Sequence, residues 1–90
     1  MVEIPKEVQD FIPGKLAWVA TASSEGVPNV TPKGSLKLLD SQHILFADIF
    51  SLKTRKNLIE NNKIAVTIAD VSNGKGYQLK GTAEVLDSGR

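Results

Sequence analysis

Two short stretches of the sequence carry residue types that suit a phosphorylated ligand. The first, residues 30–36 (VTPKGSL), is a strand pattern interrupted by Pro32 and Gly34, and the second, residues 51–54 (SLKT), opens a short predicted helix. Because proline cannot donate to a sheet ladder and glycine has no side chain, the first stretch marks a bulge, an edge or a close approach to the backbone. The helix start adds unpaired N–H groups, the positive end of the helix dipole, two hydroxyls and an ammonium. Together the two stretches predict a cradle for a flat, phosphorylated ligand.

Each stretch also has a plainer interpretation. At the helix start, Ser51 is a good N-cap and Lys53 would then lie in water, as at most helix starts. Residues 31–34 fit a bulged edge strand whose proline and lysine discourage pairing with another chain. The Lys53-Thr54 pair does not end a Walker A loop, because the six residues before it contain no glycine. On the residues alone, both interpretations stay open.

Asp48 interrupts an apolar stretch between Phe46 and Phe50. A carboxylate that shares the face of these rings is costly to bury unless it is paired or hydrogen-bonded. Asp48 therefore either lies at a ligand or subunit seam or marks a strand end that emerges into water.

The composition describes one small globular domain over residues 1–90, near the lower size limit for a self-sufficient core, so a partner subunit would help. The chain has no cysteine and His43 is its one histidine, which excludes disulfides, thiolate chemistry and a cysteine-histidine metal cluster. A formal net charge of +1 argues against dominant attraction to nucleic acid or anionic membranes. No apolar run reaches the roughly 20 residues of a membrane span and the N-terminus lacks signal-peptide blocks, so we expect a cytoplasmic protein.

Hydrophobic periodicity predicts two helices and five strands. The predicted helices cover residues 5–12 and 52–61, and the predicted strands cover residues 16–23, 27–39, 43–49, 63–71 and 77–85. The apolar stripe of the first helix consists of Ile4, Val8, Phe11 and Ile12. In the second helix, Leu52, Leu58 and Ile59 are expected to face the core, and both faces of the strand at residues 16–23 are expected to be largely buried. Short turns between so many strands favour a mainly β fold, a small antiparallel barrel whose closure removes exposed edges.

The order of these elements resembles the FMN-binding split-barrel family, which includes pyridoxamine 5′-phosphate oxidase and small FMN-binding proteins. The resemblance spans residues 16–87 and rests on the order and spacing of six segments. They are LAWVAT at 16–21, EGVP at 25–28, LKLLD at 36–40, KTRKNL at 53–58, NNKIAV at 61–66 and QLKGTAEV at 78–85.

The resemblance implies a homodimeric split β-barrel that binds FMN and transfers hydride or electrons at the flavin, with no catalytic side chain to name. Thr31, Lys53 and Thr54 are then expected to hold the FMN phosphate, and the backbone of residues 30–35 and 47–49 to border the isoalloxazine ring. The full set of expected cofactor-binding residues is Val30, Thr31, Pro32, Lys33, Ala47, Asp48, Ser51, Lys53 and Thr54. Lys33 would either offer its charge to a reduced, anionic flavin or point to solvent.

Two features depart from the family pattern. Pyridoxamine-phosphate oxidases use an arginine-rich strand and an Arg-Lys pair at the helix start, where this chain has Thr31-Pro32-Lys33 and Lys53-Thr54. Oxidation of pyridoxamine phosphate itself is therefore not expected. Members also continue with a helix and a strand beyond the position of Gly89, so we expect either a minimal or a truncated member.

Three alternatives remain beside the flavoprotein. One is a split barrel with another bulky cofactor, such as deazaflavin or haem, and another is a barrel that has lost its cofactor. The third is a small nucleic-acid-binding barrel with a basic groove and aromatic stacking. Its groove would consist of Lys53, Arg55, Lys56 and Lys63, with Trp18 or Tyr77 for stacking.

Overall fold

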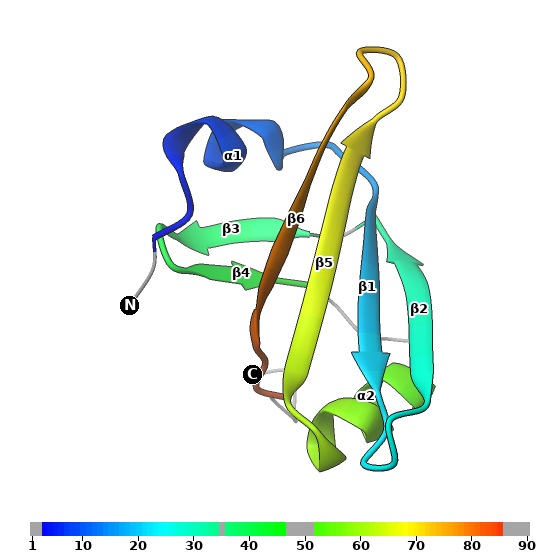
Figure 1. Cartoon of the computed structure of the whole chain (residues 1–90). Coiled ribbons are helices and arrows are strands. Elements are labelled where there is room, and N and C mark those ends of the chain that lie inside the picture. Colours follow the sequence, from blue (N-terminus) through cyan, green and yellow to red (C-terminus); the bar gives the residue numbers. More distant parts are fainter. Residues whose placement is uncertain (1–2, 35, 47–51, 86–90) are drawn as a thin grey trace.

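Two antiparallel sheets and two helices make up the part of the chain that the computed structural model describes, residues 3–34, 36–46 and 52–85 without the side chain of Leu52. The helices are α1 (Lys6–Phe11) and α2 (Leu52–Glu60) (Figure 1). The strands are β1 (Ala17–Ala22), β2 (Pro28–Lys33), β3 (Lys37–Asp40), β4 (His43–Leu45), β5 (Lys63–Asp70) and β6 (Lys75–Thr82). The mainly β class and the positions of both helices agree with the sequence prediction.

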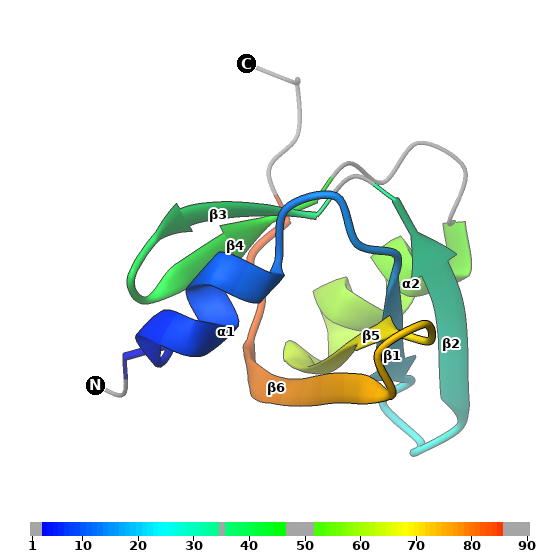
Figure 2. The same cartoon turned by 90° about the horizontal axis from the view of Figure 1, so that it is seen from above.

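The larger sheet has the strand order β2-β1-β5-β6, and β3 pairs with β4 in a separate hairpin that crosses this sheet (Figures 1 and 2). The predicted single strand at residues 27–39 is wrong, because the chain leaves the larger sheet after Lys33 and enters the hairpin at Lys37. Pro32 and Gly34 therefore mark the end of an edge strand and a change of sheet. The β1–β2 register runs without a bulge from Ala17 opposite Lys33 to Ala22 opposite Pro28.

The core lies between the inner face of the larger sheet and the hairpin. Alternate residues of β1 point inward, and Ala17 and Val19 are fully buried there against Val66 and Ile68 of β5. The side chains that alternate with them, Trp18 among them, are half-buried on the outer face. The prediction that both faces of β1 are largely buried is therefore confirmed for the inner face only.

Helix α1 closes one end of the core with the predicted apolar stripe. Val8 and Ile12 are buried, and the ring of Phe11 meets the ring of Tyr77 edge-on with 5.0 Å between centroids. The Tyr77 hydroxyl donates to Glu7 Oε2 at 2.8 Å, so one β6 side chain contacts two residues of the helix that lie one turn apart on the same face. Aromatic pairs of this geometry add stability beyond their buried area.

Helix α2 lies near the opposite end of the sheet and presents a polar stripe to it. Thr54, Asn57 and Leu58 share the inward face at i, i+3 and i+4, and each is buried. Asn57 Nδ2 donates to Thr21 Oγ1 of β1 at 3.0 Å. The predicted inward position of Ile59 is wrong, because 66% of this residue is exposed.

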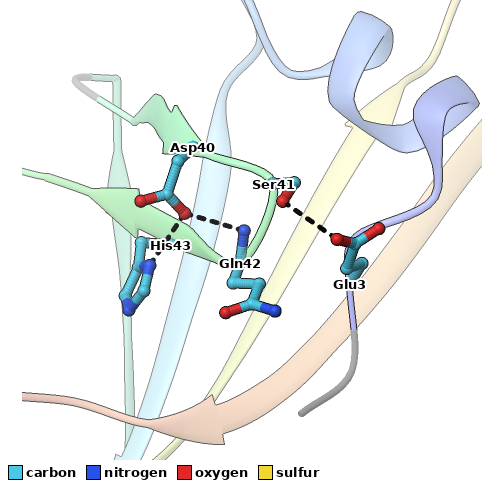
Figure 3. A network of polar contacts seen from close by, with 5 residues as sticks. All are labelled: Glu3, Asp40, Ser41, Gln42 and His43. Carbon is cyan, nitrogen blue, oxygen red and sulfur yellow. Dashed lines mark hydrogen bonds and ion pairs between the residues drawn. The ribbon is translucent and has the colours of Figure 1, made fainter.

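The β3–β4 turn is tied to the N-terminal segment (Figure 3). Ile4 N–H donates to the Ser41 carbonyl at 2.7 Å, and the Ser41 hydroxyl lies 3.5 Å from Glu3 Oε2. Asp40 Oδ1 accepts the Gln42 N–H at 2.8 Å and lies 2.7 Å from His43 Nδ1. These contacts hold the pKa of Asp40 below its ordinary value, and the hydrogen bond from the Gln42 N–H has the largest effect.

Asn57→Ala tests the polar contact between α2 and β1. We expect a loss of about 2 kcal/mol in the free energy of unfolding, because the Thr21 hydroxyl stays buried without this donor. Urea unfolding measures it, and Asn62→Ala at an exposed position is the control, expected within about 0.5 kcal/mol of wild type. Equal effects of the two substitutions would contradict this packing.

Asp40→Asn tests the contribution of the Asp40 carboxylate to the stability of the β3–β4 turn. A carboxyl whose pKa is lowered by folding stabilises the fold above its unfolded pKa, about 4, and loses that contribution as pH falls through the folded pKa. We expect wild type to lose stability more steeply than Asp40→Asn between about pH 4 and pH 2. Urea midpoints measured across this range give the comparison, and identical pH slopes would refute the role of Asp40.

Candidate functional site

Strand β2 forms one edge of the larger sheet and turns alternate side chains to opposite faces. Asn29, Thr31 and Lys33 stand opposite Thr21, Val19 and Ala17 of β1, so they share the inner face. Val30 and Pro32 stand on the outer face and are exposed. The expected cofactor residues of this strand therefore divide into an inner pair, Thr31 and Lys33, and an outer pair.

Lys33 is buried to 8% exposure at the inner end of this row. This burial shows that the alternative in which Lys33 points to solvent is wrong. An ammonium so far from water is costly unless charge or hydrogen bonds compensate it. Lys33 thus belongs to the inner face of β2 with little of its surface open to water.

The first turn of α2 lies against the same face of β2. Asn29 Nδ2 donates to Thr54 Oγ1 at 3.1 Å, and Thr54 is only 1% exposed. Lys53, its neighbour, is exposed. The structure therefore brings the Asn29 end of the strand row and the first turn of α2 together, and it turns the Thr54 hydroxyl into the protein, toward Asn29.

Three of the expected cofactor residues, Ala47, Asp48 and Ser51, lie outside the described residues. Sequence reasoning missed Asn29 and Asn57, both of which hold α2 in place. The signal for Asn29 was its period-two alternation with Thr31 and Lys33, and the signal for Asn57 was its i+3 spacing from Thr54. Both patterns were visible, but they use polar residues where a search for apolar stripes finds nothing.

The outer face of the larger sheet carries a second notable surface. Both helices lie on the other side of the sheet, toward β3 and β4 (Figure 2). Small and apolar side chains occupy the middle of this outer face, and a shallow hollow over β1, β5 and β6 is rimmed by Lys63 and Lys80. The apolar set consists of Trp18, Ala20, Ala22, Val30, Pro32 and Ala65. We name this set the outer apolar face.

The basic groove of the alternative nucleic-acid module does not gather with Tyr77, one of the two aromatic residues expected to stack there. Lys56 and Lys63 are exposed on α2 and at the start of β5, and Lys56 lies 3.5 Å from Glu60. Tyr77 stands opposite Ile68, toward the far end of β5, and packs on α1. Stacking on Tyr77 beside these cations is therefore not possible.

Within the described ranges, no cluster of three histidine, aspartate or glutamate side chains is arranged to hold a metal ion. In the same residues, neither helix has the length and apolar character needed to cross a membrane. The candidate site is thus a set of hydroxyl, ammonium and backbone donors, which suits an anion.

Comparison with known proteins identifies the family. Residues 4–90 match the family described as pyridoxamine 5′-phosphate oxidase, and the chain belongs to this family. An uncharacterized protein of Methanocaldococcus jannaschii is 40% identical over 99% of the chain, which spans 60% of that relative's length.

Solved structures agree on the fold. HupZ of group A Streptococcus is 36% identical, with a TM-score of 0.86 over 97% of this chain and 74% of that one, in a structure of its H111A variant. A candidate pyridoxamine 5′-phosphate oxidase of Lactobacillus delbrueckii is 28% identical, with a TM-score of 0.84 over 91% and 68% of the two chains. HutZ, the haem storage protein of Vibrio cholerae, is 15% identical with a TM-score of 0.72 over 99% and 67%, and shares the fold. The predicted split barrel is confirmed.

Proposed function

We propose that the chain binds FMN as a flavoprotein of this family, with the FMN phosphate between the inner face of β2 and the first turn of α2. The observation that carries the proposal is the contact of Asn29 with Thr54, which sets the first turn of α2 beside the Asn29 end of the inner row that continues to Thr31 and Lys33. Thr31 is the next inner residue of the strand after Asn29, and Lys33 follows it two residues further on.

The donor set fits a phosphate in charge and geometry. The first turn of α2 has backbone N–H groups without partners in the helix, and its dipole adds positive potential. Lys53 is exposed beside them, and Lys33 adds positive charge from the strand. Charge-assisted bonds from such groups are about twice as strong as neutral ones.

The residues of the chain then bind and orient the cofactor. Bound FMN would supply hydride or electron transfer, while the protein supplies position and electrostatic potential. Thr31 and Lys53 would hold the phosphate, and the β2 backbone around Val30 and Pro32 would border the ring. Because the chain has Thr31-Pro32-Lys33 where pyridoxamine-phosphate oxidases have arginines, we propose an oxidoreductase or electron-transfer role with a different substrate.

Haem is the second candidate cofactor, because HutZ, which shares the fold, is a haem storage protein. His43 is the one histidine of this sequence, and it lies on the β3–β4 hairpin with Nδ1 against Asp40. That hairpin turn is separated from α2 in both views (Figures 1 and 2). The donors beside α2 are ammonium and amide groups, which favour the flavin phosphate.

We also propose a homodimer that pairs through the outer apolar face. Its centre is small and apolar and its rim carries Lys63 and Lys80, the arrangement of apolar core and polar rim that protein interfaces show. Val30 is 63% exposed in a single chain, so pairing would remove apolar surface from water. This surface is continuous with β2, which would place the interface beside the flavin.

Lys53→Ala tests the phosphate site. We expect FMN affinity to fall about 10- to 100-fold, the effect of losing a charge-assisted contact, while riboflavin affinity stays unchanged. Titration of the purified protein with each flavin, followed by absorption and fluorescence, measures both. Lys56→Ala is the matched control, since Lys56 is exposed on the same helix and contacts Glu60.

Absorption spectra decide the cofactor class in the same experiment. Saturable FMN binding with a preference over riboflavin supports the flavoprotein, whereas a Soret band on haem titration, lost in His43→Ala, supports the second candidate. A wild type that ignores both ligands would overturn the proposed function.

Val30→Glu tests the homodimer. A carboxylate in the outer apolar face of each chain would have to be desolvated on pairing, so we expect the variant to be monomeric where wild type is dimeric. Sedimentation velocity gives the mass, and Val71→Glu, at an 88% exposed turn position, is the matched control. A monomeric wild type refutes the dimer, and a dimeric Val30→Glu refutes its placement on this face.

A further inference from the structure

Four polar side chains join α2 to the β1–β2 hairpin in a repeating pattern. Asn29 of β2 donates to Thr54 of α2 at 3.1 Å, and Asn57 of α2 donates to Thr21 of β1 at 3.0 Å. In each bond an asparagine amide donates to a threonine hydroxyl. The asparagine belongs to the sheet in the first bond and to the helix in the second. We call these four residues the polar clamp.

The spacing of the polar clamp matches on its two sides. Thr21 and Asn29 are direct partners across the β1–β2 ladder, and such partners lie about 5 Å apart. Thr54 and Asn57 are three residues apart on one helix face, where side chains are about 5 to 6 Å apart. One bond would let the helix pivot, whereas two bonds at equal spacing fix both its position and its direction.

Burial makes the polar clamp hard to rearrange. Thr54 and Asn57 are each 1% exposed and Thr21 is 5% exposed, so water cannot replace the partners that the clamp provides. Buried polar groups without partners are costly, so a helix shifted along the hairpin would be penalised twice. Asn29, half-buried on the edge strand, is the member nearest to Thr31 and Lys33.

We propose that Asn29 and Thr54 are positioning residues of the phosphate site, with Thr54 acting through its contact with Asn29 rather than by touching the phosphate. The inference rests on the proposed function and deepens it. The Thr54 hydroxyl is turned to Asn29 and covered, so the phosphate is held by Thr31 of β2 and, from α2, by Lys53 and the first-turn N–H groups. The Asn29–Thr54 bond sets where those groups stand relative to β2.

The test is the ratio of FMN to riboflavin affinity in Asn29→Ala, Thr54→Val and the double variant. Thr54→Val keeps the side-chain volume and removes the hydroxyl. We expect each single variant to lose about tenfold in FMN affinity with riboflavin affinity unchanged. The double variant should lose no more than either single one, because both remove the same bond. Thr54→Ser restores the hydroxyl and should restore the ratio, and Asn62→Ala serves as the control.

The outcomes separate the inference from the function on which it rests. An unchanged ratio of FMN to riboflavin affinity in Asn29→Ala overturns the inference but not the proposed FMN binding. A loss of FMN affinity in Thr54→Val but not in Asn29→Ala has the same consequence, because it would mean that the hydroxyl contacts the phosphate directly. Wild type that does not bind FMN overturns both. Far-UV circular dichroism verifies folding, and if Asn29→Ala does not fold, the comparison of Thr54→Val with Thr54→Ser carries the test.

Discussion

The polar clamp is the interaction on which the arrangement of this small barrel depends. Each of its two bonds is neutral and adds about 1 kcal/mol net, which is modest beside the burial of the apolar core. Its larger effect is to destabilise alternative positions of α2, because a clamp residue that is shifted from its partner stays buried without a hydrogen bond. Apolar packing tolerates sliding of a helix over a sheet, whereas hydrogen bonds between paired donors and acceptors form in only one position of the helix. The clamp therefore selects one placement of α2, and with it the point where β5 begins.

Strand β2 has two functions because it is an edge. Its inner Asn29 contacts α2, and its outer Val30 and Pro32 belong to the outer apolar face. Pro32 can occupy such a strand because an edge leaves half of the backbone groups without ladder partners, and it also discourages pairing with a further strand. A ligand that borders this backbone would then lie between the helix and the proposed subunit interface, which is how a chain of this size can build a site larger than one barrel offers.

The elements that the sequence predicted well are those whose burial follows apolar periodicity. The stripe of α1 depends on apolar residues at regular spacing and was right, whereas the prediction for β1, that both of its faces are largely buried, was right for the inner face only. The inward face of α2 was partly wrong because Thr54 and Asn57 occupy it while Ile59 faces water. Nothing in a hydropathy pattern shows that a polar side chain has a buried partner, since that partner lies on another element of the sequence. The burial of Lys33 could not be predicted from the sequence for the same reason.

Residue chemistry at a helix start predicted the candidate site, and the family resemblance suggested FMN as its ligand. The separate roles of the residues within the site required the structure. A hydroxyl in a first helical turn has two uses, as a contact to an anion or as an anchor for the turn, and sequence does not distinguish them. The burial of Thr54 and its bond to Asn29 favour the anchor. The fold alone does not distinguish flavin from haem, because split barrels of this shape include a haem storage protein. The two proposals differ in the side chains that they need: the exposed Lys53 lies next to Thr54 at the β2–α2 junction, whereas the imidazole of His43 lies at the separate β3–β4 turn.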